Sequence, residues 1–135
     1  MKKVPRISES EWEVMKVLWK KSPATANEIV AHLTKQTKWK RETIRTFINR
    51  LVQKKVVGFE KRGRQYYYSA AVTEEQCVHA ETKAFLNRVH HGSIEPMLAK
   101  FVEKENLSPE KIARLREVLD EARRTTKRKG KRSPH

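Results

Sequence analysis

The chain has 135 residues, enough for one domain of ordinary size or two small ones, which excludes the large barrel and doubly wound enzyme folds. With 31 Lys and Arg against 16 Asp and Glu, it carries a formal net charge of +15, and 37% of its residues are hydrophobic. A charge of this sign and size favours a polyanion as partner, most commonly a nucleic acid. The alternative is a basic protein whose charge serves only its solubility.

The charge is unevenly distributed along the chain. Residues 1–72 hold 17 Lys and Arg against 6 Asp and Glu, residues 73–121 hold 7 against 10, and residues 122–135 hold 7 against none. This distribution predicts a basic N-terminal domain, a mildly acidic second domain and a basic tail, residues 122–135. Because the tail has no apolar residue after Ala122, it cannot bury surface to offset its ordering entropy, and we expect it to be disordered.

Three helices are predicted in the first 54 residues. Ser8 with Glu11 and Thr25 with Glu28 have the spacing of capping boxes, which predict helices over about residues 8–20 and 26–35. A third helix is expected over about residues 40–54. Apolar residues at helical spacing form one continuous face of it: Ile44, Phe47, Ile48, Leu51 and Val52.

The opposite face of the third predicted helix has the side chains that read DNA. With Glu42 as the only acid of this helix, the face carries Arg45, Thr46, Asn49, Arg50 and Gln53. Guanidinium, hydroxyl and amide groups are those that recognise base edges in a major groove. The sequence therefore predicts base contacts from Arg45, Thr46 and Asn49, with an ordinary solvated helix face as the alternative.

A basic hairpin is predicted next. Val56, Val57 and Phe59 indicate one strand and residues 65–69 a returning strand, joined by a turn of Lys61, Arg62, Gly63 and Arg64. Three helices followed by such a hairpin is the order of a winged helix-turn-helix domain, mainly α with a small β-hairpin. In that fold the third helix enters the major groove, and the hairpin contacts the phosphate backbone or the minor groove.

Three further helices are predicted after the hairpin, over about residues 73–90, 94–105 and from 109 to about 121. Three short helices in about 50 residues bury too little apolar surface to be stable alone. We therefore predict a helical dimerisation domain over residues 73–121, whose homodimer would match a palindromic DNA site. The alternative is a monomer in which these helices pack onto the N-terminal domain. The predicted interface residues are Phe85, Val89, Met97, Leu98, Phe101, Val102, Leu115 and Leu119.

The sequence gives little indication of catalysis, metal binding or membrane insertion. Cys77 is the only cysteine, so no internal disulfide and no thiolate metal site are expected. Cys77, His79 and Glu81 lie at a spacing that spreads them around a helix, and no Gly-rich phosphate loop is present, so we expect no enzyme, metal or cofactor. The longest apolar runs are far below the roughly 20 residues that span a bilayer, and the basic start lacks a signal peptide's apolar core. A cytoplasmic protein without membrane insertion is expected.

Several segments resemble the penicillinase-repressor family of winged-helix repressors, the BlaI/MecI/CopY type. They are ISESEWEVMKVLW at 7–19, ANEIV at 26–30, TIRTFINRL at 43–51 and the helical region at 83–119, within an overall similarity over about residues 4–121. The resemblance implies a homodimeric cytoplasmic repressor that binds an operator palindrome built on TACA/TGTA-like words. A nonspecific architectural nucleic-acid binder is the alternative, since it would share the charge.

The resemblance also implies roles for single residues. Arg45 and Thr46 match the family's base-contacting pair. The positions where the family approaches phosphates or flanking bases are Arg41, Thr43 and Arg50, and the expected phosphate contacts of the hairpin are Lys61, Arg62 and Arg64.

The resemblance is less informative about the signal that relieves repression. Antibiotic-responsive members are cleaved before the Phe of an Asn-Phe pair, which Lys100-Phe101 matches with Lys in place of Asn. This pair is the candidate cleavage position, and a sensor protease is the candidate partner. Copper-responsive members bind metal through a C-terminal cysteine motif, which is absent because no cysteine follows Cys77. The inducing signal, the target genes and the role of the tail stay open.

Overall fold

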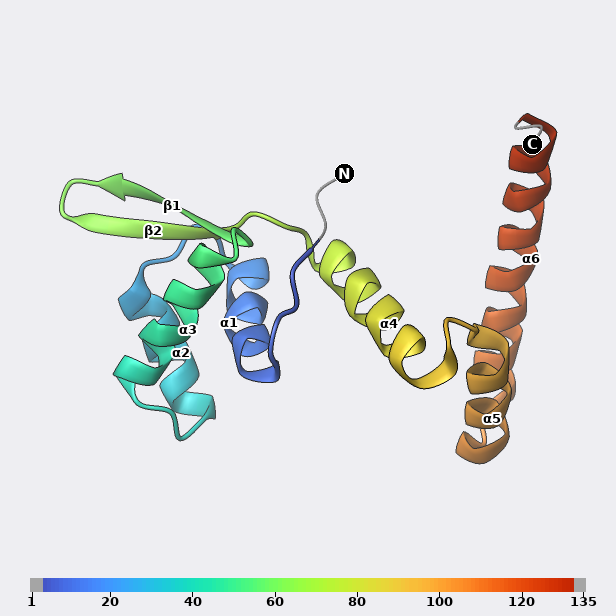
Figure 1. The fold of residues 1–135 in the computed structure, drawn as a ribbon. Helices are drawn as coiled ribbons and strands as arrows, with labels where there is room; N and C mark the ends of the chain where they lie inside the picture. Colours follow the sequence, from blue (N-terminus) through green and yellow to red (C-terminus); the bar gives the residue numbers. More distant parts are fainter. Residues whose placement is uncertain (1–3, 133–135) are drawn as a thin grey trace. The chain divides into compact units, whose positions relative to one another are not determined.

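The computed structural model describes residues 4–132, which form two compact units that divide between Phe85 and Leu86. The fold is mainly helical with one two-stranded sheet, as predicted (Figure 1). In chain order the elements are α1 Glu9–Lys20, α2 Ala26–Gln36, α3 Arg41–Gln53, β1 Val57–Arg62, β2 Gln65–Ala70, α4 Glu74–His90, α5 Ile94–Glu105 and α6 Pro109–Arg132.

Capping boxes set the starts of α1 and α2, as the sequence predicts. The Ser8 hydroxyl accepts from the Glu11 N–H at 3.1 Å, and the Glu11 carboxylate accepts from the Ser8 N–H at 3.1 Å. Thr25 and Glu28 make the same reciprocal pair, with distances of 3.2 and 2.9 Å. Each box satisfies two of the backbone N–H groups that a helix start leaves without partners.

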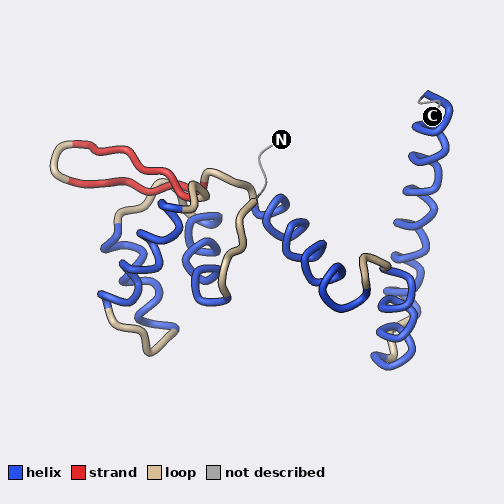
Figure 2. The backbone as a smooth tube through the Cα atoms, in the orientation of Figure 1, coloured by secondary structure: helices blue, strands red, loops and turns tan. Residues whose placement is uncertain are grey.

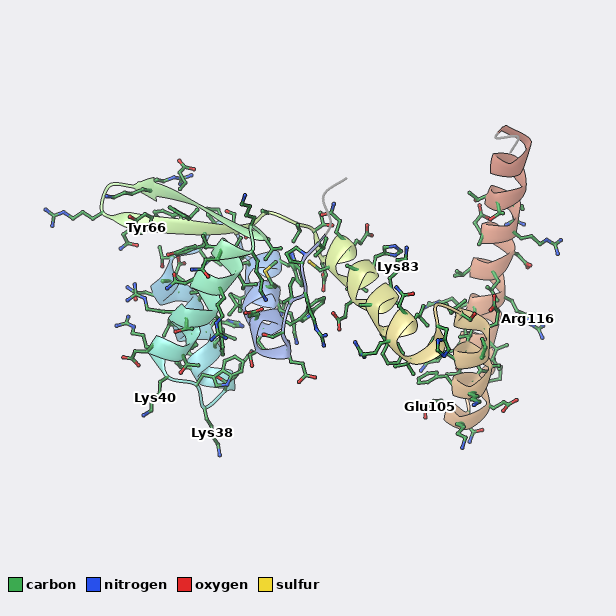
Figure 3. The ribbon with its side chains drawn as sticks, in the orientation of Figure 1. Lys38, Lys40, Tyr66, Lys83, Glu105 and Arg116 are labelled. Carbon is green, nitrogen blue, oxygen red and sulfur yellow. The ribbon has the colours of Figure 1, made fainter. Side chains whose placement is uncertain are left out.

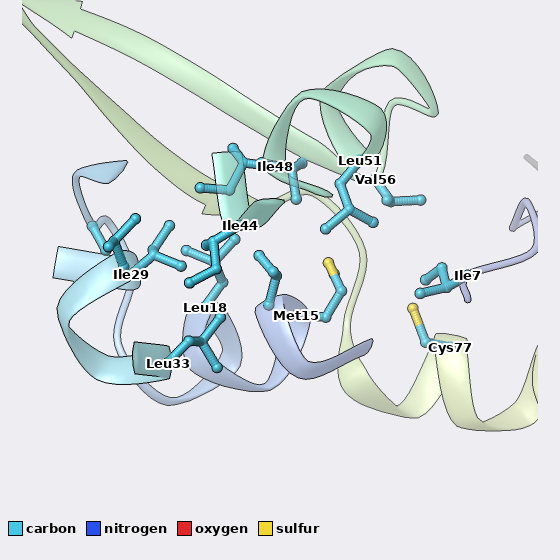
Figure 4. Close-up of a cluster of buried hydrophobic side chains, with 14 residues drawn as sticks. Ile7, Met15, Leu18, Ile29, Leu33, Ile44, Ile48, Leu51, Val56 and Cys77 are labelled. Atoms are coloured by element: carbon cyan, nitrogen blue, oxygen red, sulfur yellow. The ribbon is translucent and has the colours of Figure 1, made fainter. Parts of the chain in front are cut away.

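A single hydrophobic core holds the first unit together (Figure 4). Its largest fully buried side chains come from all three helices and from the segment after α3: Met15, Leu18, Ile29, Leu33, Ile44, Ile48, Leu51 and Val56. Cys77 of α4 also lies in this core and is 1% exposed, and burial raises the pKa of its thiol. The start of α4 therefore belongs to the first unit, which extends past the boundary expected at residue 72 because Cys77 is part of its core.

The two strands form an antiparallel hairpin (Figure 2). Its register pairs Arg62 with Gln65. The turn therefore consists of Gly63 and Arg64 alone, and the expectation that Lys61 and Arg62 belong to it is wrong, because both pair within the ladder. Gly63 has a φ of +63°, which a two-residue turn of type II′ requires at its first position.

The base of the hairpin is attached to the segment that precedes α2. Ala24 and Tyr68 form a β-bridge in which the Ala24 N–H donates to the Tyr68 carbonyl at 2.9 Å and the Ala24 carbonyl accepts from the Tyr68 N–H at 2.7 Å. Trp19 donates its indole N–H to the Val72 carbonyl at 3.0 Å, where the chain leaves β2. These bonds attach the C-terminal end of β2 and the residues just after it to the N-terminal helices and the segment between them.

A Schellman motif ends α3 and directs the chain into β1. The Val56 N–H donates to the Leu51 carbonyl at 3.2 Å, and the Lys55 N–H donates to the Val52 carbonyl at 2.9 Å. The motif needs a left-handed residue, and here it is Lys55, with a φ of 66°. The junction between α3 and the hairpin is thus set by backbone hydrogen bonds.

Replacing Lys55 with glycine is expected to raise the free energy of unfolding by about 1 kcal/mol, because glycine adopts the left-handed conformation without the steric cost of a Cβ atom. Urea denaturation measures the change. A control replacement of the exposed, helical Lys20 by glycine should destabilise the protein instead, by about 0.5–1 kcal/mol. A Lys55→Gly variant that is less stable than the original protein would contradict the view that the left-handed conformation of Lys55 costs free energy.

The second unit consists of the end of α4 with α5 and α6, and it buries little. Among its described side chains only Leu86 is buried. The tail was expected to be disordered, and this is wrong for residues 122–132, because α6 continues to Arg132; residues 133–135 lie outside the described range. Lys, Arg and Ala are strong helix formers, and Arg124 pairs with Glu121 one turn away, so the helix continues past residue 122 although residues 122–126 are exposed. No helix in the described range is long and apolar enough to span a membrane.

Candidate nucleic-acid interface

The face of α3 predicted to read DNA is open to solvent. Ile44, Ile48 and Leu51 on the other side of the helix are buried. The five residues of the predicted face are all exposed, namely Arg45, Thr46, Asn49, Arg50 and Gln53. Three buried aliphatic residues fix the rotation of the helix about its axis, so burial on one side determines which side chains point outward. The name reading face is used below for these five residues.

A polar concavity joins the reading face to the hairpin and to the start of α2. Arg45 of α3 and Arg64 of the turn both line it, and its remaining walls are Thr25, Ala26, Asn27, Gln65, Tyr66 and Tyr68. The structure therefore brings two arginines from different elements to one depression. Guanidinium groups beside a helix N-terminus are suited to binding phosphate oxygens.

Several residues of this concavity were missed by the sequence analysis. Asn27 and Tyr66 line it, yet neither was predicted to have a role. Asn27 lies in the first turn of α2, and a helix N-terminus next to a predicted reading helix was the signal that could have indicated it. Tyr66 was assigned only to a strand, because its position next to α3 depends on tertiary packing.

Two predicted contact residues of α3 already have hydrogen-bond partners. The Thr46 hydroxyl donates to the Glu42 carbonyl at 2.9 Å, which leaves its oxygen lone pairs and its methyl group for a base edge. Arg41, at the first position of α3, donates to the side-chain oxygen of Asn27. Thr43 is half-buried, and its role as a phosphate contact stays a prediction.

The predicted hairpin cations lie on different faces of the ladder. Lys61 is 5.8 Å from the centre of the Tyr66 ring. Arg62, one residue later and on the other face, pairs with the Glu60 carboxylate at 3.3 Å and lies 5.2 Å from the centre of the Tyr67 ring. Because successive residues of a strand alternate between faces, Lys61 and Arg62 point to opposite sides of the hairpin.

Lys38 and Lys40, which the sequence analysis did not select, lie beside the start of α3. Figure 3 shows both side chains extending from the loop between α2 and α3. Lys40 is the N-cap residue of α3 and makes no side-chain capping bond, so the first N–H groups of this helix are not capped by it. Two lysines at an uncapped helix start attract an anionic group.

Half of the eight residues predicted for a subunit interface are exposed, and all of them except Phe85 lie in the second unit. Phe101 is 56% exposed and Leu119 57% exposed. Phe85 and Val89 are also exposed, and the half-buried members of the set are Met97, Leu98, Val102 and Leu115. Apolar side chains exposed at this density mark an interaction surface. The candidate cleavage pair Lys100-Phe101 lies inside α5.

The one Cys/His/Glu grouping considered from sequence does not come together. Cys77 is buried in the core, whereas His79 and Glu81 are exposed. Over the described range, no three His, Cys, Asp or Glu side chains gather in a way that could hold a metal ion.

Comparison with known proteins places this geometry among bacterial repressors. Residues 7–121 match the penicillinase repressor family. The chain is 38% identical over 121 residues to the penicillinase repressor of Bacillus licheniformis, covering 90% of this chain and 94% of that protein. It is 37% identical over 118 residues to the methicillin resistance regulatory protein MecI of Staphylococcus aureus, covering 87% of this chain and 96% of that protein.

Two solved structures of the repressor BlaI are similar to this chain over about half of its length. The DNA-binding domain of the repressor BlaI is 41% identical, with a TM-score of 0.51, covering 56% of this chain and 93% of that one. Monomeric BlaI of Bacillus licheniformis in complex with the blaP half-operator has the same identity and coverage, with a TM-score of 0.50. The family match over residues 7–121 and the identity to its curated members agree with the geometry of α3 and the hairpin, and the chain belongs to the penicillinase repressor family.

Proposed function

We propose that the protein is a sequence-specific DNA-binding transcriptional repressor that acts in the cytoplasm as a homodimer on a palindromic operator. The observation that carries this proposal is the reading face on α3, which is exposed, contains no acidic residue and is continuous with the concavity shared with the hairpin. A relative with 41% identity has been solved bound to a half-operator, which supports the same use of this surface here.

The roles of single residues follow from their positions. Arg45, Thr46 and Asn49 lie along one exposed side of α3, where they would enter the major groove and contact base edges. Arg41, Thr43 and Arg50 on α3, and Lys61, Arg62 and Arg64 on the hairpin, would contact the phosphate backbone on either side. Phosphate contacts set the register and orientation of the protein, and base contacts select the sequence.

The test is a selection of duplexes from a random-sequence pool by the full-length protein, followed by a gel-shift comparison with a scrambled duplex at physiological salt. We expect an inverted repeat to be recovered and bound roughly 10³-fold or more tightly than the scrambled duplex. Equal affinity for both duplexes would overturn the repressor proposal. It would favour a nonspecific architectural binder, for which positive charge alone suffices.

The dimer is proposed from the second unit. With Leu86 as the only buried residue among its described side chains, this unit has no core of its own, and apolar side chains of α4, α5 and α6 are left exposed. A second copy of the chain would cover these side chains and form a shared core. A two-fold dimer also matches the symmetry of an inverted repeat.

Replacing Phe101 with aspartate is expected to convert the dimer to a monomer, because it places a charge in the proposed shared core. Sedimentation velocity measures the mass at a concentration where the unchanged protein is a dimer. Ala99→Asp adds the same charge on the far side of α5 from the apolar stripe, and it should leave the dimer intact. If the Phe101→Asp protein keeps the mass of a dimer, the dimer interface does not include Phe101.

Relief of repression is proposed to involve the dimerisation helices, with proteolysis at Lys100-Phe101 by a sensor protease as one route. This pair lies in the interior of α5, and a protease binds its substrate as an extended chain. Cleavage at this position would therefore need α5 to unwind locally, and it would remove Phe101 from the proposed interface.

A further inference from the structure

We propose that two exposed aromatic rings of the hairpin, Phe59 and Tyr66, contact the deoxyribose surface of DNA beside the half-site and contribute affinity that does not depend on salt. The inference rests on the proposed function and deepens it. It assigns apolar contacts to a hairpin whose individually predicted residues, Lys61, Arg62 and Arg64, were all expected to contact phosphates.

The two rings are exposed although they belong to a strand ladder. Phe59 is 54% exposed and Tyr66 is 44% exposed, and their rings pack edge to face with centroids 5.2 Å apart. The edge-to-face contact holds each ring in place against the other. A preordered ring loses little side-chain entropy on binding, so it is suited to contact a partner.

Phe59 and Tyr66 lie on the face of the hairpin that turns toward the reading helix. Phe59 is the register partner of Tyr68, and cross-strand partners point to the same side of a sheet. Tyr66 and Tyr68 are two residues apart and share that side. Both tyrosines line the concavity that contains Arg45, and Figure 3 shows Tyr66 on the hairpin in the first unit, which also carries α3.

The surroundings of the rings indicate DNA as the partner. Lys61 lies on the same face, with its ammonium nitrogen 5.8 Å from the centre of the Tyr66 ring, and Arg64 of the turn lines the same concavity as Tyr66. A backbone strand of DNA presents anionic phosphates alternating with apolar sugar surface. Cations interleaved with exposed rings are complementary to that alternation, and the face is continuous with the proposed base-reading surface.

Salt distinguishes the two kinds of contact. A lysine that binds a phosphate releases condensed counterions, so each lost phosphate contact lowers the slope of log K against log salt by about 0.9. A ring against a sugar releases no counterion, because it buries apolar surface. Loss of the rings should therefore lower affinity by the same factor at every salt concentration.

The experiment measures binding of the full-length protein to the selected inverted-repeat duplex by fluorescence anisotropy between about 50 and 200 mM salt. For the double variant Phe59→Ala/Tyr66→Ala we expect about a tenfold loss of affinity at all salt concentrations, with an unchanged slope. Lys61→Gln should lower the slope by about 0.9. Tyr66→Phe keeps the ring and should bind within twofold of the original protein.

Tyr67→Ala is the matched control, since it removes a tyrosine ring from the opposite face of the same strand. It should leave affinity within about twofold. Thermal melting of each variant reports whether the hairpin remains folded, and Tyr66→Ala alone is the milder substitution if the double variant melts early.

Unchanged affinity of the double variant would overturn the inference while leaving the repressor function intact. A loss of affinity accompanied by a lower slope would also overturn it, because the rings would then act only by positioning Lys61. If the unchanged protein binds the selected and the scrambled duplexes equally, the proposed function fails. In that case, the affinity of the Phe59→Ala/Tyr66→Ala variant for the scrambled duplex, measured across the same salt range, still decides whether the rings contact DNA.

Discussion

Replacing Arg45 with alanine is expected to weaken operator binding by about 1–3 kcal/mol, which is about 5- to 150-fold, with little change in nonspecific binding. Arg45 is exposed on α3 and lines the concavity between the reading face and the hairpin. A guanidinium that contacts a base edge distinguishes one sequence from another, so its loss lowers the specificity ratio. Anisotropy titrations with the selected and the scrambled duplex measure both affinities.

Arg50→Ala is the matched control for Arg45→Ala, since it removes an exposed arginine from the same helix. As a predicted phosphate contact, Arg50 should contribute equally to both duplexes, and its loss should lower the salt slope by about 0.9. Equal losses of specific and nonspecific affinity in Arg45→Ala would show that Arg45 contacts only phosphate. Both variants should melt at the temperature of the original protein, because neither side chain is buried.

Replacing Lys54 with methionine is expected to lower the free energy of unfolding by about 3 kcal/mol, because it leaves a buried carboxylate without its cation. The Lys54 ammonium pairs with the Glu11 carboxylate, which is 2% exposed, and donates to the Arg6 carbonyl at 2.7 Å. Lys54 thereby ties α3 to α1 and to the segment before α1. Urea denaturation at pH 7 measures the loss.

Glu11→Gln should cost less, about 1–2 kcal/mol, because the side chain of Lys54 is about one third exposed and its ammonium can turn to water. Lys16→Met is the matched control for Lys54→Met, since Lys16 pairs with Glu13 on the same helix α1 at an exposed position. It should change stability by less than about 1 kcal/mol. Similar losses in Lys16→Met and Lys54→Met would contradict the importance of burial.

The same pair predicts a pH dependence of stability. Burial alone would raise the pKa of Glu11, but hydrogen bonds from Lys54 and Ser8 and the attraction of the Lys54 charge outweigh it and lower the pKa. A carboxyl with a lowered pKa contributes stability that is complete above its unfolded pKa, about 4.3, and is lost as the pH falls through the folded value. The stability difference between the original protein and Glu11→Gln should therefore be constant near neutral pH and shrink below about pH 4.

Local signals in the sequence predicted the elements well. The capping boxes at Ser8 and Thr25 placed two helix starts, because the bonds that cap a helix join residues three positions apart. The spacing of Ile44, Ile48 and Leu51 correctly indicated the buried side of α3, and hence its exposed reading face. The turn was predicted two residues too long, because ladder pairing, which no local signal reports, takes up Lys61 and Arg62.

The sequence by itself determined the order of elements, the distribution of charge and the polar face of α3, since each depends on residues that are close along the chain. Only the tertiary structure decided that Cys77 belongs to the first core, that Lys54 pairs with Glu11, and that Arg45 shares a concavity with Asn27 and Tyr66. These contacts join residues that are distant in sequence, and their partners are selected by how the helices and the hairpin pack. Helical periodicity identifies which face of an element is buried, but not which distant side chain it meets.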